Sequence, residues 1–338
     1  MKTFVGVDYH KRFSYAAIMG EDGEILKEGR FPNTAEAVER FLGKHAGDEC
    51  ASVLEATRNW CVMYDWLEAC CGSVTLAHAL KVRAIAEAKI KTDKIDATTL
   101  AHLLRCDLVP KAHVSSPAAR VLKNLLRHRM FLVKVQTMTK NRIHALIDRH
   151  PHVRRQRPAQ ELFNRAGIAW LKHVALPRHD RSILDSELLV LDELRQRIRQ
   201  ADAQLQDAAL NDTRVHRLIT IPGIGVFFAM LIVSEIDDIS RFGNPKKLHA
   251  YAGLVPSTYA SGGRQYHGRL IKAGNPYLRW AMIEAVWPAL RKDPALNECY
   301  QRIKRRKGAN KAKVAAARRL LTIVYRVLKE NRPWREAA

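Results

Sequence analysis

Four acidic residues in the first third of the chain have the types and spacing of a metal site. Asp8 ends the first apolar run, and Glu55 ends a later one, so we expect both at the ends of strands, where sites usually lie. Asp93 and Asp96 are three residues apart on an expected helix and share one face. Converging carboxylates repel one another unless divalent cations neutralise them. Two Mg²⁺ ions about 4 Å apart can clamp the attacking and leaving oxygens of a phosphodiester exchange. Taken singly, each acid is better explained as a surface acid in a cap or a salt bridge.

A second segment whose residues could take part in catalysis lies in the last third of the chain. Ser261 precedes two glycines in a segment rich in arginine and lysine. A hydroxyl there could attack a phosphorus, with Arg264, Lys272 or Arg279 stabilising the developing charge. The plainer alternative is a turn, because Ser-Gly-Gly is a common turn sequence. No nearby His or Asp is an obvious base, so a metal or an acid of the first domain would have to take the proton.

The segment 218–225, Leu-Ile-Thr-Ile-Pro-Gly-Ile-Gly, joins two expected helices and resembles a helix-hairpin-helix motif. Its glycines, Gly223 and Gly225, allow a tight turn. Exposed N–H groups at the start of the next helix can then hold a DNA phosphate. Such a contact recognises the backbone and not the base sequence. A purely structural glycine-rich turn is the alternative.

The elements that position these residues form an α/β domain followed by all-α domains. Over the first 110 residues the expected order is β-β-β-α-β-α-β-α, which is the order of a ribonuclease H-like (RuvC-like) mixed sheet with helices. The metal acids of that fold occupy the structural positions of the four acids above. Long helices are expected over 116–150 and 181–209, and residues 213–338 are mostly helical with a glycine-rich interruption at 253–275.

The second long helix carries an apolar seam with nearly heptad spacing, which indicates a coiled coil. The seam can pair with the first long helix or with a second subunit, and the sequence leaves both open. Its residues are Leu184, Leu188, Leu191, Leu194, Ile198, Ala201 and Leu205. We therefore expect three domains: a metal-dependent domain over 1–110, a basic helical linker over 111–210, and a C-terminal domain over 211–338 with the hairpin motif and the serine loop.

The charge is distributed very unevenly along the chain. The net charge is +23, yet residues 1–110 hold 14 basic and 16 acidic residues, whereas 111–338 hold 43 basic and 18 acidic ones. A basic surface of this size favours a polyanion through phosphate neutralisation and counterion release. The six cysteines lack a metal-ligand pattern, no signal peptide is evident, and the longest apolar stretch, 226–233, is too short to span a bilayer. We therefore expect a cytoplasmic, nucleoid-associated bacterial protein and no membrane partner.

Seven short pieces of the chain, taken in order, resemble the insertion-sequence transposases that have an N-terminal RuvC-like DEDD domain and a C-terminal serine-bearing domain. Piv-type DNA invertases are relatives of that family. Single pieces are weak, but the ordered set spans nearly the whole chain and is highly specific. The pieces are Gly6-Val7-Asp8, Leu54-Glu55-Ala56-Thr57, Lys91-Thr92-Asp93-Lys94-Ile95-Asp96-Ala97, Ile221-Pro222-Gly223-Ile224-Gly225, Tyr251-Ala252-Gly253-Leu254-Val255-Pro256, Ser261-Gly262 and Lys272-Ala273-Gly274.

The resemblance implies more than the composition does. It implies that Asp8, Glu55, Asp93 and Asp96 form the metal site and that Ser261 is a nucleophile that becomes covalently linked to DNA. It also implies one composite active site, homodimers or homotetramers, and a non-coding bridge RNA that selects target and donor DNA. The sequence departs from the family at Gly263-Arg264, where the loop is variable, so the resemblance assigns the serine but not the residues that assist it.

Two other functions remain open at this point. A RuvC-like junction-resolving endonuclease would hydrolyse DNA with a metal-bound water and would form no covalent protein–DNA adduct. A non-catalytic nucleic-acid-binding protein would use the same basic helices, and Mg²⁺ would make no difference to its action on DNA. The leading hypothesis is a Mg²⁺-dependent, RNA-guided recombinase that moves its own element.

Overall fold

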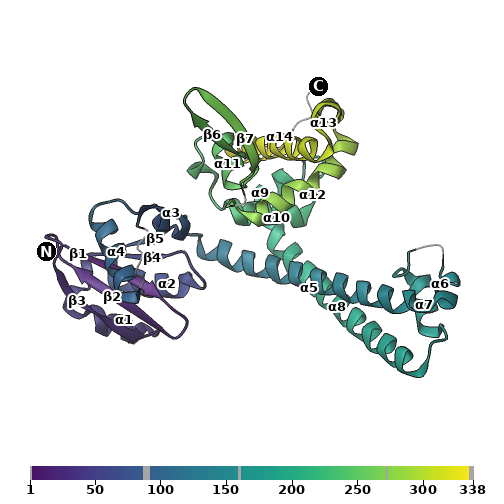
Figure 1. Ribbon diagram of the computed structural model, residues 1–338, viewed down its shortest axis with the longest axis horizontal. Coiled ribbons are helices and arrows are strands. Elements are labelled where there is room, and N and C mark those ends of the chain that lie inside the picture. Colours follow the sequence, from purple (N-terminus) through teal and green to yellow (C-terminus); the bar gives the residue numbers. More distant parts are fainter. Residues whose placement is uncertain (1, 87–91, 159–160, 272, 335–338) are drawn as a thin grey trace. The chain divides into compact units, whose positions relative to one another are not determined.

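The computed structural model describes residues 2–86, 92–158, 161–271 and 273–334, and it divides into two compact units (Figure 1). The first unit is Met1–Val114 and the second is Ser115–Ala338. The boundary lies close to the expected one at residue 110. The second unit contains both the expected linker and the expected C-terminal domain.

The first unit is built on a five-stranded mixed sheet whose element order agrees with the expected β-β-β-α-β-α-β-α. The strands are β1 (Thr3–Tyr9), β2 (Phe13–Met19), β3 (Ile25–Pro32), β4 (Gly47–Glu55) and β5 (Cys71–Ala77), and their order in the sheet is β3-β2-β1-β4-β5. The pairs β1–β2 and β2–β3 are antiparallel, whereas β1–β4 and β4–β5 are parallel. The helices are α1 (Ala35–Leu42), α2 (Trp60–Cys70), α3 (Ala79–Ile85) and α4 (Asp93–Arg105), with a short 3-10 turn, η1 (Gly43–His45).

Helices cover both faces of this sheet. On one face, α1 and α2 pack on a core that includes Val7 and Leu54. On the other face, α4 lies directly against β1 because Gly6 has no side chain there. A Cβ on Gly6 would lie 2.0 Å from the carbonyl oxygen of Ala97, far inside van der Waals contact. Side chains alternate along a strand, so Asp8, two residues after Gly6, belongs to the face that α4 covers.

The second unit begins with two long helices that pack along each other, α5 (Pro117–Asp148) and α8 (Arg178–Leu210) (Figure 1). The short helices α6 (Pro151–Arg155) and α7 (Arg165–His173) lie in the connection between them. Ion pairs cross between the long helices, from Arg129 to Asp202 at 2.9 Å and from Arg142 to Glu187 at 2.6 Å. Of the two partners that the sequence left open for the apolar seam, the structure shows α5 of the same chain.

The remainder of the second unit is mostly helical around a large apolar core. Its helices are α9 (Thr213–Leu218), α10 (Val226–Ile236), α11 (Pro245–Tyr251), α12 (Pro276–Lys292), α13 (Pro294–Lys307) and α14 (Ala309–Lys329), with a short 3-10 turn, η2 (Ile239–Arg241). The core is formed mainly by α10, α12 and α14. None of the helices in the described part of the chain is long and apolar enough to cross a membrane.

The glycine-rich interruption, which the sequence suggested to be a loop, contains a two-stranded hairpin. Strand β6 (Pro256–Ser261) pairs antiparallel with β7 (Arg264–Leu270). The two residues between them, Gly262 and Gly263, have φ of +54° and +75°. A two-residue hairpin turn that needs positive φ at both positions matches the right-handed twist of the strands, and glycine adopts it without strain. The Gly-Gly pair is therefore the centre of a tight hairpin.

A buried acid, Glu235 at the end of α10, ties three elements of the second unit together. Its side chain is 2% exposed and accepts a hydrogen bond from Arg127 at 2.9 Å, while the Lys123 ammonium lies 4.0 Å away. It also accepts from the side-chain amide of Asn275 at 2.9 Å, and Asn275 caps the start of α12. Burial lowers the pKa of Lys123, and the carboxylate of Glu235 opposes that shift. Glu235 thus neutralises two cations inside the unit.

Glu235→Gln is expected to destabilise the second unit by about 3 kcal/mol, because removing one partner of a buried pair leaves the other charge uncompensated. The matched control is Glu193→Gln, which breaks an exposed ion pair with Arg197 one turn away on α8 and is expected to cost at most about 0.5 kcal/mol. Urea unfolding followed by circular dichroism measures both variants. Equal losses for the two variants would show that Glu235 has no special structural role.

Candidate active site

Strand pairing places Asp8 and Glu55 beside each other at one edge of the first unit's sheet. In the parallel pair β1–β4, Val7 is opposite Leu54, so Asp8 and Glu55 follow at the same level. Adjacent strands lie about 4.8 Å apart. Val7 and Leu54 are buried on the α1–α2 face, and alternation therefore directs the two acids toward the face covered by α4. Both strand-end predictions are thus consistent with the strands that the structure shows.

Helix α4 begins at this edge and supplies the other two acids. Its N-cap is Thr92, whose hydroxyl accepts a hydrogen bond from the backbone N–H of Ile95 at 3.2 Å. Asp93 is the first helical residue, and Asp96 lies in the same first turn. The positive end of the helix dipole stabilises carboxylates at these positions. Lys91, which precedes the cap in the sequence motif, lies outside the described residues.

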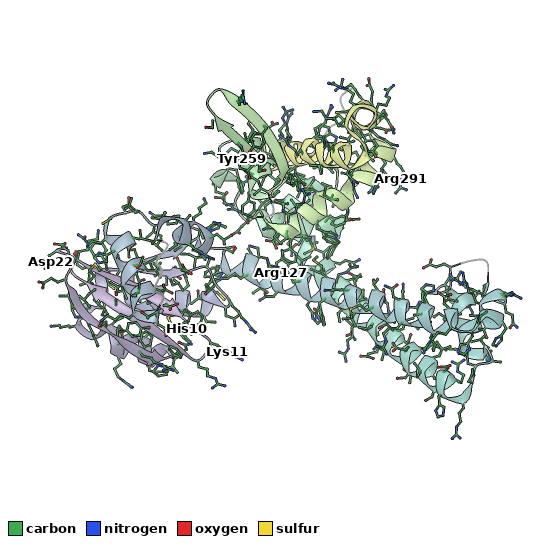
Figure 2. All side chains as sticks on the ribbon, viewed as in Figure 1. His10, Lys11, Asp22, Arg127, Tyr259 and Arg291 are labelled. Carbon is green, nitrogen blue, oxygen red and sulfur yellow. The ribbon has the colours of Figure 1, made fainter. Side chains whose placement is uncertain are left out.

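Asp8 and Asp93 meet at a histidine that the sequence reasoning missed, His10, which Figure 2 labels in the first unit. The His10 Nε2 atom lies 3.1 Å from the carboxylates of both Asp8 and Asp93. One ligand atom from each of the three residues lies within 4.8 Å of the others. The backbone at His10, directly after β1, is held in place because the Asn33 side chain donates a hydrogen bond to the His10 carbonyl at 2.7 Å. Two carboxylates and an imidazole nitrogen form a donor set that fits a divalent cation.

Glu55 and Asp96 line a cavity of about 440 Å³ between α3 and α4. Arg83 contributes a cation to the same wall and Thr99 contributes a hydroxyl, whereas the other lining residues are apolar: Ala79, Leu80, Val82, Ala86, Ile95 and Leu100. Within the described residues, the group close enough to share one ion is Asp8, His10 and Asp93. The structure therefore brings two of the four predicted acids into one ligand group and places the other two on a cavity wall.

The candidate nucleophile, Ser261, is the last residue of β6 and is exposed at the tip of the hairpin. It pairs directly with Arg264, the first residue of β7, which is also exposed. Arg279 belongs to the base of the hairpin, where its guanidinium donates to the Ile271 carbonyl at 3.4 Å and packs so closely on Gly253 that a Cβ there would lie 2.3 Å from Nη1. The predicted phosphate contact of Lys272 lies outside the described residues.

The turn between α9 and α10 gives its two glycines different surroundings. Gly223 has φ of +88°, and a Cβ there would lie 2.6 Å from backbone atoms of Ala285 and Ala289 on α12. Packing against α12 therefore requires a glycine at position 223, which could not be foreseen from the sequence. Gly225 caps α10 and has open space where a Cβ would stand. Phosphate binding at Gly225 and Gly223 stays a prediction.

A basic groove of about 700 Å³ lies between β7 and the helices α13 and α14. Its floor is partly apolar, and among the described residues that line it none is acidic. Six of the lining residues are cationic: Arg269, Arg302, Arg306, Lys307, Lys311 and Arg318. The charge asymmetry of the sequence indicates a polyanion, but it could not locate this groove, because the six residues come from three separate elements.

Together, a mixed α/β unit with acids at its sheet edge and a basic helical unit with an exposed serine define a nucleic-acid-processing enzyme. Comparison with known families agrees. Residues 5–151 match the DEDD transposase domain of the IS110 type, and residues 215–301 match the family described as "Transposase IS116/IS110/IS902 family". The chain belongs to the IS110/IS116/IS902 family of transposases, enzymes of DNA cleavage and strand transfer.

Curated relatives support this assignment. A probable family 20 transposase of Pseudomonas aeruginosa is 26% identical over 255 residues, which are 73% of this chain and 75% of that protein. A putative transposase of Sinorhizobium fredii, y4rJ, is 30% identical over 268 residues, 70% of this chain and 66% of that protein. The pilin gene-inverting protein of Moraxella bovis is 36% identical over 125 residues, 36% of this chain and 38% of that protein. The resemblance to transposases and to Piv-type invertases is thereby confirmed.

Proposed function

We propose that this chain is the transposase of an insertion sequence and that it exchanges DNA strands through Ser261, with Mg²⁺ at the acids of the first unit and a bridge RNA selecting the DNA. The proposal rests above all on one observation, the meeting of Asp8 and Asp93 at the edge of the sheet. The strand order β3-β2-β1-β4-β5 supports a ribonuclease H-like fold, in which metal acids occupy this edge. The protein would act in the bacterial cytoplasm, on the nucleoid.

Each residue of the proposed site has a distinct task. Asp8 and Asp93 would hold one divalent ion, and Glu55 and Asp96 would complete a ligand set for two Mg²⁺ ions when DNA is bound. When bound, such an ion would supply charge neutralisation at the phosphate and would make proton loss from a nearby hydroxyl easier. Arg264, directly opposite Ser261, stabilises the negative charge that develops on the phosphate oxygens.

The proposed chemistry conserves the phosphodiester bond energy. The Ser261 oxygen attacks the phosphorus, so a bond from serine to phosphorus forms and a bond from phosphorus to one nucleotide oxygen breaks. The serine proton leaves to an acid of the first unit or to solvent, and the released nucleotide oxygen takes up a proton. Attack by the hydroxyl of another strand reverses these steps, joins the new DNA and regenerates the serine. Ser261 and the acids therefore have to act on one phosphate, within one chain or between the chains of a dimer or tetramer.

The charge distribution supports nucleic acid as the partner of the second unit. The basic groove and the Gly225 N-terminus of α10 offer phosphate contacts, which position a strand without recognising its sequence. Base pairing to a bridge RNA would supply the sequence specificity that such contacts lack.

One assay separates this function from its alternatives. The purified chain is incubated with end-labelled DNA carrying an element junction, with or without the RNA transcribed from the element's flank, and the products are run on a denaturing gel. We expect a slowly migrating covalent protein–DNA adduct that requires both Mg²⁺ and the RNA. Cleaved DNA without an adduct would favour the junction-resolving endonuclease, and products unaffected by EDTA would contradict metal dependence. An adduct formed without RNA would contradict the proposed role of the RNA as a guide.

A further inference from the structure

The hairpin carries two tyrosines whose position is not explained by packing. Tyr259 on β6 pairs directly with Tyr266 on β7. Their ring centroids lie 5.0 Å apart with an interplanar angle of 17°, so the rings are stacked. Both stay exposed, at 54% for Tyr259 and 64% for Tyr266. Figure 2 labels Tyr259 on this hairpin. An exposed aromatic pair of this size is a surface prepared for a partner with a flat face.

The tyrosines share a face of the hairpin with the candidate nucleophile. The register pairs Ser261 with Arg264 and, two residues further from the tip, Tyr259 with Tyr266. Alternation puts residues two apart on the same face, so the four side chains form two adjacent rows that are about 7 Å apart along the strands. A phosphate held between Ser261 and Arg264 therefore has an aromatic surface beside it.

The same face leads into the basic groove. Gly268 is the next residue of that row on β7, and it also lines the groove. A Cβ there would lie 3.6 Å from the Tyr259 ring, so the ring reaches alongside Gly268. The serine and the two tyrosines thus share a face of the hairpin with Gly268, one of the residues that line the basic groove. Aromatic side chains next to a positively charged groove are the combination that binds single-stranded nucleic acid, because bases stack on the rings while cations hold the backbone.

We propose that Tyr259 and Tyr266 form a stacking subsite for an unpaired base of the DNA strand that Ser261 attacks. This inference rests on the proposed role of Ser261 for its place in the reaction. The subsite is a positioning device, because a base held on the rings fixes the neighbouring phosphate beside the serine. It tolerates any base, since every base has a flat face.

The stacking is tested by binding in the Ser261→Ala background, without metal, so that no chemistry is required. The probes are oligothymidylate and an abasic oligomer of the same length, which carry the same charge and differ in their bases. The parent should prefer oligothymidylate roughly 10- to 100-fold. The double variant Tyr259→Phe with Tyr266→Phe should keep that preference. The double variant Tyr259→Leu with Tyr266→Leu, which keeps apolar bulk on the hairpin, should lose most of it.

The matched control is Phe131→Ala, which removes another exposed aromatic ring, 60% exposed, from α5 of the same unit. Its preference should equal that of the parent. A full preference in the leucine variant, or a loss in the phenylalanine variant, would overturn the stacking subsite. With Ser261 restored, the leucine variant should form the covalent adduct at least about tenfold more slowly. An unchanged rate would show that the subsite does not serve the attacked strand, whereas failure of the serine itself would leave the binding result intact.

Discussion

Ser261→Ala is expected to abolish the covalent protein–DNA adduct and all strand exchange. Loss of a nucleophile costs enzymes about 10⁴-fold or more in rate, because the remaining groups cannot form the covalent intermediate. Ser261 is exposed at the tip of a hairpin, so removing its hydroxyl leaves the core of the second unit untouched. Adduct formation on a denaturing gel measures the chemistry, and a mobility-shift titration measures binding, which should change by no more than about twofold.

The control for this prediction is Thr258→Val. Thr258 lies on the same strand but, by alternation, on the opposite face of the hairpin, and valine preserves its shape. This variant should form the adduct at the parental rate. Strand exchange by Ser261→Ala at a rate close to that of the parent would eliminate the nucleophile role.

Asp8→Asn is the second large expected effect, a loss of about 10³-fold or more in the rate of Mg²⁺-dependent adduct formation. Asparagine keeps the size of the side chain but offers a neutral amide oxygen. The side chain at this position on β1 would then no longer offset the positive charge of the divalent ion. Asp8 is 22% exposed at its side chain, in a group that includes Asp93, and the isosteric change should leave the sheet folded. Adduct rates measured against Mg²⁺ concentration test this, together with calorimetric titration of Mn²⁺ into the protein alone.

Glu39→Gln is the matched control for Asp8→Asn. Glu39 is an exposed acid on α1, which packs on the other face of the sheet. Its loss removes one negative charge from the same unit without touching the proposed ligands. Metal titration and rate should both stay at the parental values. If Asp8→Asn also retained them, the metal site would have to lie elsewhere.

The strand-end acids could be predicted from the sequence, because an apolar run followed by an acid indicates, within a few consecutive residues, both a strand and an acid at its end. Asp8 and Glu55 both follow such apolar runs. The start of the helix at Asp93 is indicated by Thr92, a residue type that commonly caps helices. His10 was missed, since a single histidine after a strand belongs to no periodic pattern. Its meeting with Asp93 depends on α4 packing over Gly6, which joins residues far apart in the chain.

The hairpin was missed for a different reason. Its strands are short and polar and lack the apolar alternation by which strands are recognised, although the Gly262-Gly263 pair was a turn signal. The seam of α8 was predicted, but its partner was not, because a heptad pattern fits any complementary helix. Gly223 shows the same limit. A glycine is required there because α12, some 60 residues later in the chain, leaves no space for a side chain.

The most direct test of the account is to identify the residue that becomes attached to DNA. The adduct formed with Mg²⁺ is trimmed with nuclease, digested with protease and analysed by mass spectrometry. We expect a nucleotide phosphate on the peptide that contains Ser261, linked to the serine oxygen, and no such peptide from Asp8→Asn. A nucleotide found instead on Tyr259 or Tyr266, or an Asp8→Asn protein that still labels Ser261 fully, would contradict it.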